Sequence, residues 1–184
     1  MLEESVHEGL EGHDEIASGK HGVLTVGGAR AVILTQNAYA FMMQVLHEHA
    51  PHAIKYAFYD MGYQVGRQLM AAMMIEDSAP EKGFRLLVNS YKQLGYGDLQ
   101  VDHFDIDGPE ARLSGTNLFE TGVARMSGVY RTPRCVDHYS RGMFAGFLSD
   151  FLKREVVCEE VACTYRGDPR CEFVVLPYET NQRT

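Results

Sequence analysis

The residues most able to do chemistry are the four cysteines, all of which lie in the last third of the chain. Cys163 and Cys171 flank Gly167-Asp168-Pro169, and a hairpin that turns there brings both sulfur atoms to one end of a sheet. Cys135 precedes a helical pattern that can fold over the same end. If the chain is cytosolic, grouped cysteines favour a metal over a disulfide, because that compartment keeps thiols reduced.

Zinc suits such a group because it takes four tetrahedral ligands, accepts thiolate and carboxylate, and has no redox chemistry of its own. Cys135, Cys163 and Cys171 leave one ligand to find. The local candidates for the fourth ligand are Glu160, Cys158 and His138. The alternative is that the cysteines are buried, reduced and packed as small hydrophobic side chains. Spacing alone leaves both interpretations open, since the pattern lacks two C-x-x-C pairs.

A second candidate site lies in the two helical patterns at residues 35–50 and 52–74, which are rich in methionine and aromatic residues. Such side chains suit a planar apolar ligand, although each of them can equally be ordinary core. Gly62 and Gly66 cost roughly 1 kcal/mol each against alanine in a helix, which indicates a close approach of backbone or ligand. The predicted walls of the ligand site are Phe41, Tyr59, Met61 and Tyr63.

The elements that must position these residues follow from hydrophobic periodicity and turn residues. Short strands are predicted at residues 21–26 and 29–34, and helices at 35–50, 52–74 and 80–94. A hairpin of residues 98–107 and 111–119 follows, then a glycine-punctuated stretch, a helix at 136–153, and a second hairpin of residues 155–165 and 171–177. This order predicts a single α+β domain, in which an antiparallel sheet packs against helices and the C-terminal hairpin carries the cysteines.

Composition bounds the class of protein. Hydrophobic residues are 45% and charged residues 23% of the chain, and no apolar run approaches the ~20 residues of a membrane span. The start has no signal-peptide pattern, so we expect a cytoplasmic protein. Residues 1–19 hold six of the 25 acidic residues and no Lys or Arg, which predicts a flexible acidic tail before a domain at 20–184. No basic stripe remains to bind nucleic acid.

Residues 142–173, GMFAGFLSDFLKREVVCEEVACTYRGDPRCEF, resemble the C-terminal signature of the 4-vinyl reductase domain family. The shared features are a helix with G-x-x-x-G, a strand with E-x-x-C, a G-D-P turn and C-x-F. Residues 57–69, AFYDMGYQVGRQL, are similar to an earlier helix of the family. The resemblance implies a small-molecule-binding domain of the kind that senses phenols and alkylbenzenes in bacterial regulators. Related proteins are implicated in bacteriochlorophyll vinyl reduction and in vesicle tethering.

The resemblance also implies ligands and partners. In the family's aromatic sensors, the positions that match Cys135, Glu160, Cys163 and Cys171 hold zinc. Cys158 remains an alternative to Glu160, because it lies two residues earlier on the same face of a regular strand. The family's sensors use a His and a Trp for phenol, whereas this chain has no Trp. These domains usually pair, so we expect a homodimer.

The sequence favours a zinc-containing binding or sensor module for a hydrocarbon, aromatic or tetrapyrrole-like molecule, without its own DNA-binding domain. No dinucleotide fingerprint, P-loop or catalytic triad is visible, which favours a non-enzymatic role. A signal would pass through the homodimer or to a partner protein. The first alternative is a reductase or accessory protein of tetrapyrrole metabolism, although a zinc ion with four protein ligands supplies no hydride or electron. The second is a structural assembly partner.

Overall fold

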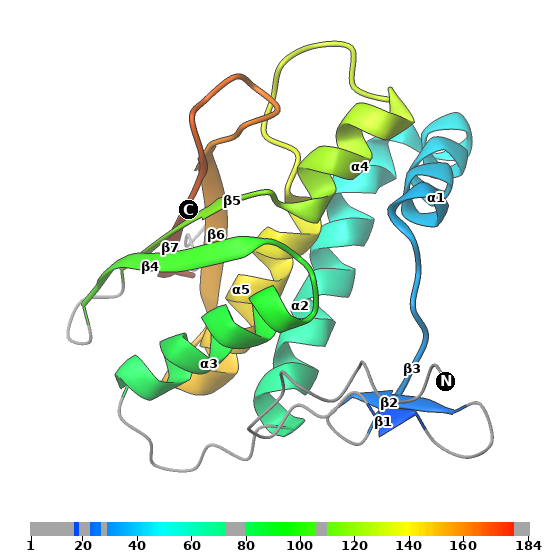
Figure 1. The fold of residues 1–184 in the computed structure, drawn as a ribbon. Coiled ribbons are helices and arrows are strands. Elements are labelled where there is room, and N and C mark those ends of the chain that lie inside the picture. The colour runs from blue at the N-terminus through cyan, green and yellow to red at the C-terminus, as the bar shows by residue number, and fades with distance from the viewer. Residues whose placement is uncertain (1–16, 19–22, 27–28, 73–79, 106–109, 179–184) are drawn as a thin grey trace, which may run out of the picture.

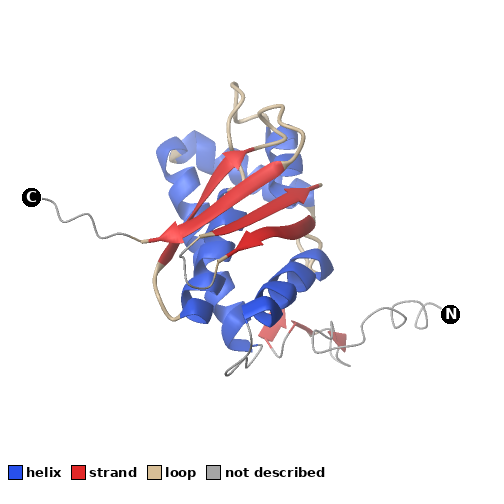
Figure 2. Cartoon of the chain, turned by 90° about the vertical axis from the view of Figure 1, so that its left-hand side faces the viewer, coloured by secondary structure: helices blue, strands red, loops and turns tan. Residues whose placement is uncertain are grey.

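The fold is described from a computed structural model of the chain, over residues 17–18, 23–26, 29–72, 80–105 and 110–178. It is an α+β fold, as the sequence predicted, with five α-helices and two antiparallel sheets in this described part. In Figure 2 the strands of the larger sheet lie in front, with helices behind them and along the lower edge. None of the described helices is long and apolar enough to cross a membrane.

The first two helices form where the sequence predicted them. Helix α1 spans Gln36–His49 and begins at Thr35, whose side-chain oxygen accepts a hydrogen bond from the backbone N–H of Ala38 at 3.3 Å. Pro51 then starts the short 3₁₀ helix η1, Pro51–Ala53, and α2 follows at Ile54–Ala72. Helix α3, Pro80–Gln93, also agrees with its predicted range.

Helix α5, His138–Leu152, is the most buried helix among the described elements and packs along α2 (Figure 1). Two glycine pairs make this contact. A Cβ at Gly62 or Gly66 would overlap the carbonyl oxygen of Tyr139 or Met143 in α5. Gly142 and Gly146 stand in the same way against Tyr59 and Tyr63 of α2. The backbone approach that the glycines of α2 indicated is therefore the approach of another helix.

The larger sheet has the strand order β4-β5-β7-β6, and every neighbouring pair is antiparallel. The two predicted hairpins form it: β4 Asp98–Phe104 with β5 Ala111–Thr116, and β6 Val156–Ala162 with β7 Cys171–Pro177. Alternate residues of the strands, among them Leu113 and Phe173, are buried. The other face carries Gln100, Glu159 and Leu176, which are exposed.

One predicted element is wrong. The sequence extended the strand that begins at Ala111 to Phe119 and left the next residues irregular, but β5 ends at Thr116 and helix α4 occupies Phe119–Ser127. Asn117, with φ of 55°, turns the chain out of the strand. Buried contacts of Val123 and Ala124, which are fully covered, hold a helix that its glycine and threonine residues do not favour by propensity.

The smaller sheet consists of β1 Ala17–Ser18, β2 Leu24–Val26 and β3 Ala29–Ala31. The predicted strand pair is confirmed in β2 and β3. Strand β1 falls inside the range predicted as an acidic tail, whose residues 1–16 lie outside the described part. Within that part, the three strands contact one another and no other helix or strand. Exposed residues 32–34 join them to α1 (Figure 1).

The contact of α2 with α5 predicts the effect of a single methyl group. We expect Gly146→Ala to lower the free energy of unfolding by about 1–3 kcal/mol, because the new Cβ forces two helix backbones apart. Chemical denaturation measures this change. Gly122→Ala in α4 is the control, since its Cβ meets only the end of the Gln36 side chain, and we expect no loss there. Equal stability of wild type and Gly146→Ala contradicts the backbone contact.

Candidate metal centre and aromatic cluster

Four buried side chains converge where the C-terminal hairpin meets the start of α5. They are Asp137, Glu160, Cys163 and Cys171, and one oxygen or sulfur atom of each lies within 4.8 Å of those of the other three. We call this group the metal cluster. Figure 1 shows the turn between β6 and β7 beside the segment that leads into α5.

A β-bulge brings Glu160 and Cys163 to the same side of the hairpin. In a regular strand, residues three apart point to opposite faces. Here the pairing of β6 with β7 shifts between Glu160 and Ala162, so that one additional residue, Val161, stands opposite the partner strand. Glu160 and Cys163 are both buried, whereas Val161 is exposed. The E-x-x-C spacing therefore works through the bulge.

The turn that joins the hairpin strands places Cys163 next to Cys171. The Asp168 carboxylate accepts hydrogen bonds from the backbone N–H of Cys163 at 2.8 Å and from Nε of Arg166 at 2.7 Å. Gly167 has φ of +106°, which a residue with a side chain rarely adopts. The Sγ of Cys171 lies 3.3 Å from the backbone nitrogen of Thr164, so the sulfur atom accepts a bond from the turn.

Asp137 reaches the metal cluster from the residue that precedes α5. Its backbone N–H donates to Oε2 of Glu160 at 3.0 Å, and its carboxylate accepts from the hydroxyl of Thr121 at 3.2 Å. The Sγ of Cys163 lies 3.8 Å from Oδ2 of Asp137. These contacts tie α4, α5 and the hairpin together at one point.

The electrostatics of the metal cluster fit a cation. Burial raises the pKa of Glu160 to about 10, with the neighbouring Asp137 carboxylate adding to the shift, and burial also raises the pKa of Asp137. Oε1 of Glu160 is buried and has no hydrogen-bond partner among the described residues. Two carboxylates and two thiols are donors that zinc accepts, and a metal that binds them displaces their protons.

Three of the four predicted metal ligands thus lie together, and Cys135 is not part of the metal cluster. Cys135 is half-buried, and its Sγ lies 3.9 Å from a guanidinium nitrogen of Arg166. Cys158 is fully buried on the same strand as Glu160, yet it also lies outside the cluster, as does His138. Sequence reasoning missed Asp137. Its only signals were a carboxylate two residues after Cys135 and its place at the start of a helix.

The predicted walls of the ligand site do not surround an interior space in this chain. The side chains of Phe41 and Met61 are 64% and 38% exposed. Tyr59 lies under the guanidinium of Arg141, with 5.5 Å between that group and the ring centre. The hydroxyl of Tyr63 donates to Glu155 at 2.6 Å. Tyr59 and Tyr63 therefore line the edge of the contact between α2 and α5.

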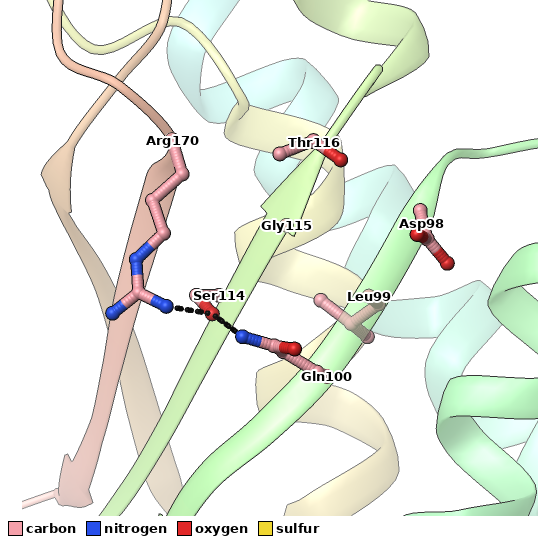
Figure 3. Close-up of a pocket in the computed structure, with 7 residues that line it drawn as sticks. All are labelled: Asp98, Leu99, Gln100, Ser114, Gly115, Thr116 and Arg170. Atoms are coloured by element: carbon pink, nitrogen blue, oxygen red, sulfur yellow. Dashed lines mark hydrogen bonds between the residues drawn. The ribbon is translucent and has the colours of Figure 1, made fainter.

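A hollow of about 120 Å³ lies on the larger sheet, as Figure 3 shows. Arg170 and Gln100 each donate a hydrogen bond to the hydroxyl of Ser114 there, at 3.0 and 2.9 Å. Arg170 also pairs with Asp102 and Glu172. The hollow is smaller than the roughly 300–1,000 Å³ of small-molecule sites and polar, so it does not match the apolar site that the sequence predicted.

Aromatic side chains gather instead between α1, α4 and α5. The ring of Phe119 lies 5.3 Å from that of Tyr39, 5.0 Å from that of Tyr96 and 5.8 Å from that of Tyr139. Phe58 of α2 packs against Tyr39 at 5.1 Å. We call these residues the aromatic cluster: Tyr39, Phe58, Tyr96, Phe119 and Tyr139.

The aromatic cluster is polar as well as apolar. The hydroxyls of Tyr96 and Tyr139 share a hydrogen bond of 3.0 Å. The hydroxyl of Tyr39 is buried and has no partner among the described residues, and the same holds for nearby Tyr130. Burial raises the pKa of Tyr39, with Glu120 adding to the shift, and raises the pKa of Tyr130 to about 12. Neutral hydroxyls can therefore donate or accept a hydrogen bond at this place.

Comparison with known proteins gives one family and several folds. Residues 127–177 match the model of the 4-vinyl reductase domain. The chain is similar to the phenol-responsive sensory domain of the transcription activator PoxR, solved with phenol, with a TM-score of 0.77, 19% identity, and 90% of this chain and 85% of that chain covered. No curated protein matches the chain in sequence.

Two further solved structures share the fold less closely. A vinyl-4-reductase family protein from Methanocaldococcus jannaschii has a TM-score of 0.57 and 18% identity, over 81% of this chain and 85% of that one. A trafficking protein particle complex subunit 3 from Naegleria fowleri, covalently bound to palmitic acid, has a TM-score of 0.50 and 18% identity, over 78% and 95%. The resemblance that the sequence indicated is thus confirmed, and the chain carries a 4-vinyl reductase domain, whose family model matches residues 127–177.

Proposed function

We propose that this chain is a small-molecule-binding sensor module whose ligand is an aromatic molecule with a hydroxyl group. The observation that carries the proposal is the pair of buried, unpartnered hydroxyls, Tyr39 and Tyr130, beside a set of aromatic rings in the described part of the chain. The similarity of fold to a phenol-responsive sensory domain supports it.

The aromatic cluster supplies both kinds of contact that such a ligand needs. Ring faces and edges at about 5 Å spacing accept another ring by stacking or edge contact. A ligand hydroxyl can pair with the Tyr39 oxygen, which otherwise stays buried without a partner at a cost of about 1–3 kcal/mol. Because the chain has no Trp, tyrosine hydroxyls take the place of an indole N–H as polar partners.

The metal cluster adds a structural zinc site to the proposal. Asp137 takes the place that the sequence gave to Cys135, and Glu160, Cys163 and Cys171 complete four ligands. All four are buried and come from separate parts of the chain, so a bound ion would hold the hairpin to the start of α5. Four protein ligands leave no open position for catalysis, which favours a structural ion over a reactive one.

A homodimer completes the proposal, because a sensor must report to another chain. Several apolar side chains of α1 and α2 are exposed, and contiguous apolar surface of this kind is typical of protein interfaces. They are Phe41, Met42, Val45, Tyr56 and Met61. The residues that the sequence assigned to ligand walls would then in part line a subunit contact.

Phenol is the first probe of the ligand site. We expect the wild-type protein to bind phenol more tightly than benzene in calorimetric titration, and Tyr39→Phe to lose about tenfold in phenol affinity, because one hydrogen bond contributes roughly 0.5–1.5 kcal/mol. Tyr56→Phe, at an exposed ring, is the matched control and should bind as the wild type does. Absence of phenol binding, or equal affinity in Tyr39→Phe, contradicts the proposed site and leaves the assembly-partner alternative.

Metal analysis tests the ligand set. We expect about one zinc ion per chain in protein purified without chelator, and loss of most of it in Asp137→Asn and Cys171→Ser, with a sharply lower melting temperature in both. Cys135→Ser should keep its zinc, because Cys135 lies outside the metal cluster. Zinc that is lost in Cys135→Ser and kept in Asp137→Asn restores the set that the sequence predicted.

Light scattering tests the pairing. We expect a dimer at micromolar concentration, and a monomer for Val45→Glu, because its side chain is 54% exposed on α1 and a charge there opposes apolar contact. Leu176→Glu places the same charge on the open face of the larger sheet and should remain dimeric. A wild-type monomer refutes the homodimer.

A further inference from the structure

Three consecutive residues at the start of α4 contact three different parts of the molecule. Phe119 belongs to the aromatic cluster, Glu120 contacts the start of α5, and Thr121 contacts the metal cluster. The two candidate sites thus meet at one helical turn.

Glu120 fixes the position of the N-terminus of α5. Its carboxylate is fully buried and accepts hydrogen bonds at 2.8 Å from the backbone N–H of Tyr139, the backbone N–H of Ser140 and the hydroxyl of Ser140. A carboxylate stabilises the exposed N–H groups and positive end of a helix. Since Asp137 and Tyr139 flank His138 in this turn, Glu120 positions one member of the metal cluster and one ring of the aromatic cluster together.

Phe119 and Thr121 extend this contact in both directions. The Phe119 ring meets Tyr39 and Tyr139 edge to face, at interplanar angles of 88° and 84°. The Thr121 hydroxyl donates to Asp137 at 3.2 Å and lies 3.8 Å from Sγ of Cys171. A shift of the α4 turn therefore changes contacts at both sites.

We propose that the first turn of α4, residues Phe119, Glu120 and Thr121, couples the two sites, so that an aromatic ligand tightens the bound metal and the metal tightens the ligand. This inference rests on the proposed function. A ligand against Phe119 and Tyr139 restrains the turn and the start of α5, which holds Asp137 at the metal. Coupling between binding sites is reciprocal, so both affinities must change by the same factor.

The test measures both affinities in the full chain. Zinc affinity is determined by competition with a chromophoric chelator, with and without saturating phenol, and phenol affinity is determined with and without zinc. We expect phenol to raise zinc affinity about fivefold or more, at the lower end of typical coupling, and zinc to raise phenol affinity by the same factor.

Variants locate the coupling in α4. Thr121→Val removes the hydroxyl at nearly constant volume and should bring the factor close to one, while Thr121→Ser keeps the hydroxyl and should keep the coupling. Glu120→Gln should reduce it as well, because an amide cannot accept all three bonds. Glu110→Gln, at an exposed ion pair with Arg112, is the matched control.

The outcomes separate this inference from the proposed function. If phenol and zinc both bind and the factor is one or below in the wild type, the coupling is refuted while the proposed function stands. A full factor in Thr121→Val also refutes the role of α4. If either phenol or zinc fails to bind to the wild type, the proposed function fails and the coupling fails with it.

Discussion

The close approach of α2 and α5 is the constraint on which the rest of the structure depends. Gly62, Gly66, Gly142 and Gly146 leave the two helix backbones in contact, so α5 sits deep against α2 on one side and against the sheet on the other. Nearly all of α5 is consequently buried, including its first turn. A helix N-terminus without water must find its partners inside the protein, and both candidate sites are built around the residues that supply them.

Burial of that turn concentrates acidic groups in a small volume. Glu120 is compensated by donors from the backbone and side chains of α5, and burial together with Asp137 raises its pKa to about 8. Glu160 and Asp137 have fewer donors, and a cation is the natural complement to two carboxylates beside two thiols. The same burial keeps the neighbouring tyrosine hydroxyls neutral, which suits them to recognise a neutral aromatic molecule rather than an ion.

Local patterns predicted the parts of the fold that depend on local physics. The Thr35 cap, the break at Pro51 and both long hairpins follow from neighbouring residues, and so did Glu160, Cys163 and Cys171, because one turn joins them. Helix α4 and Asp137 were missed because tertiary contacts, not propensity or spacing, determine them. The glycines of α2 signalled a close approach correctly, but one sequence cannot say whether a ligand or a helix approaches. The tyrosine rings of the aromatic cluster come from distant segments, so no local pattern could join them.

Where an aromatic ligand binds is the central question, and nuclear Overhauser contacts to bound phenol answer it most directly. In protein with labelled aromatic and methionine side chains, we expect contacts from the phenol ring to Tyr39, Phe119 and Tyr139. Contacts confined to Phe41 and Met61 would place the ligand on the outer side of α1 and α2 and contradict the aromatic cluster as the binding site.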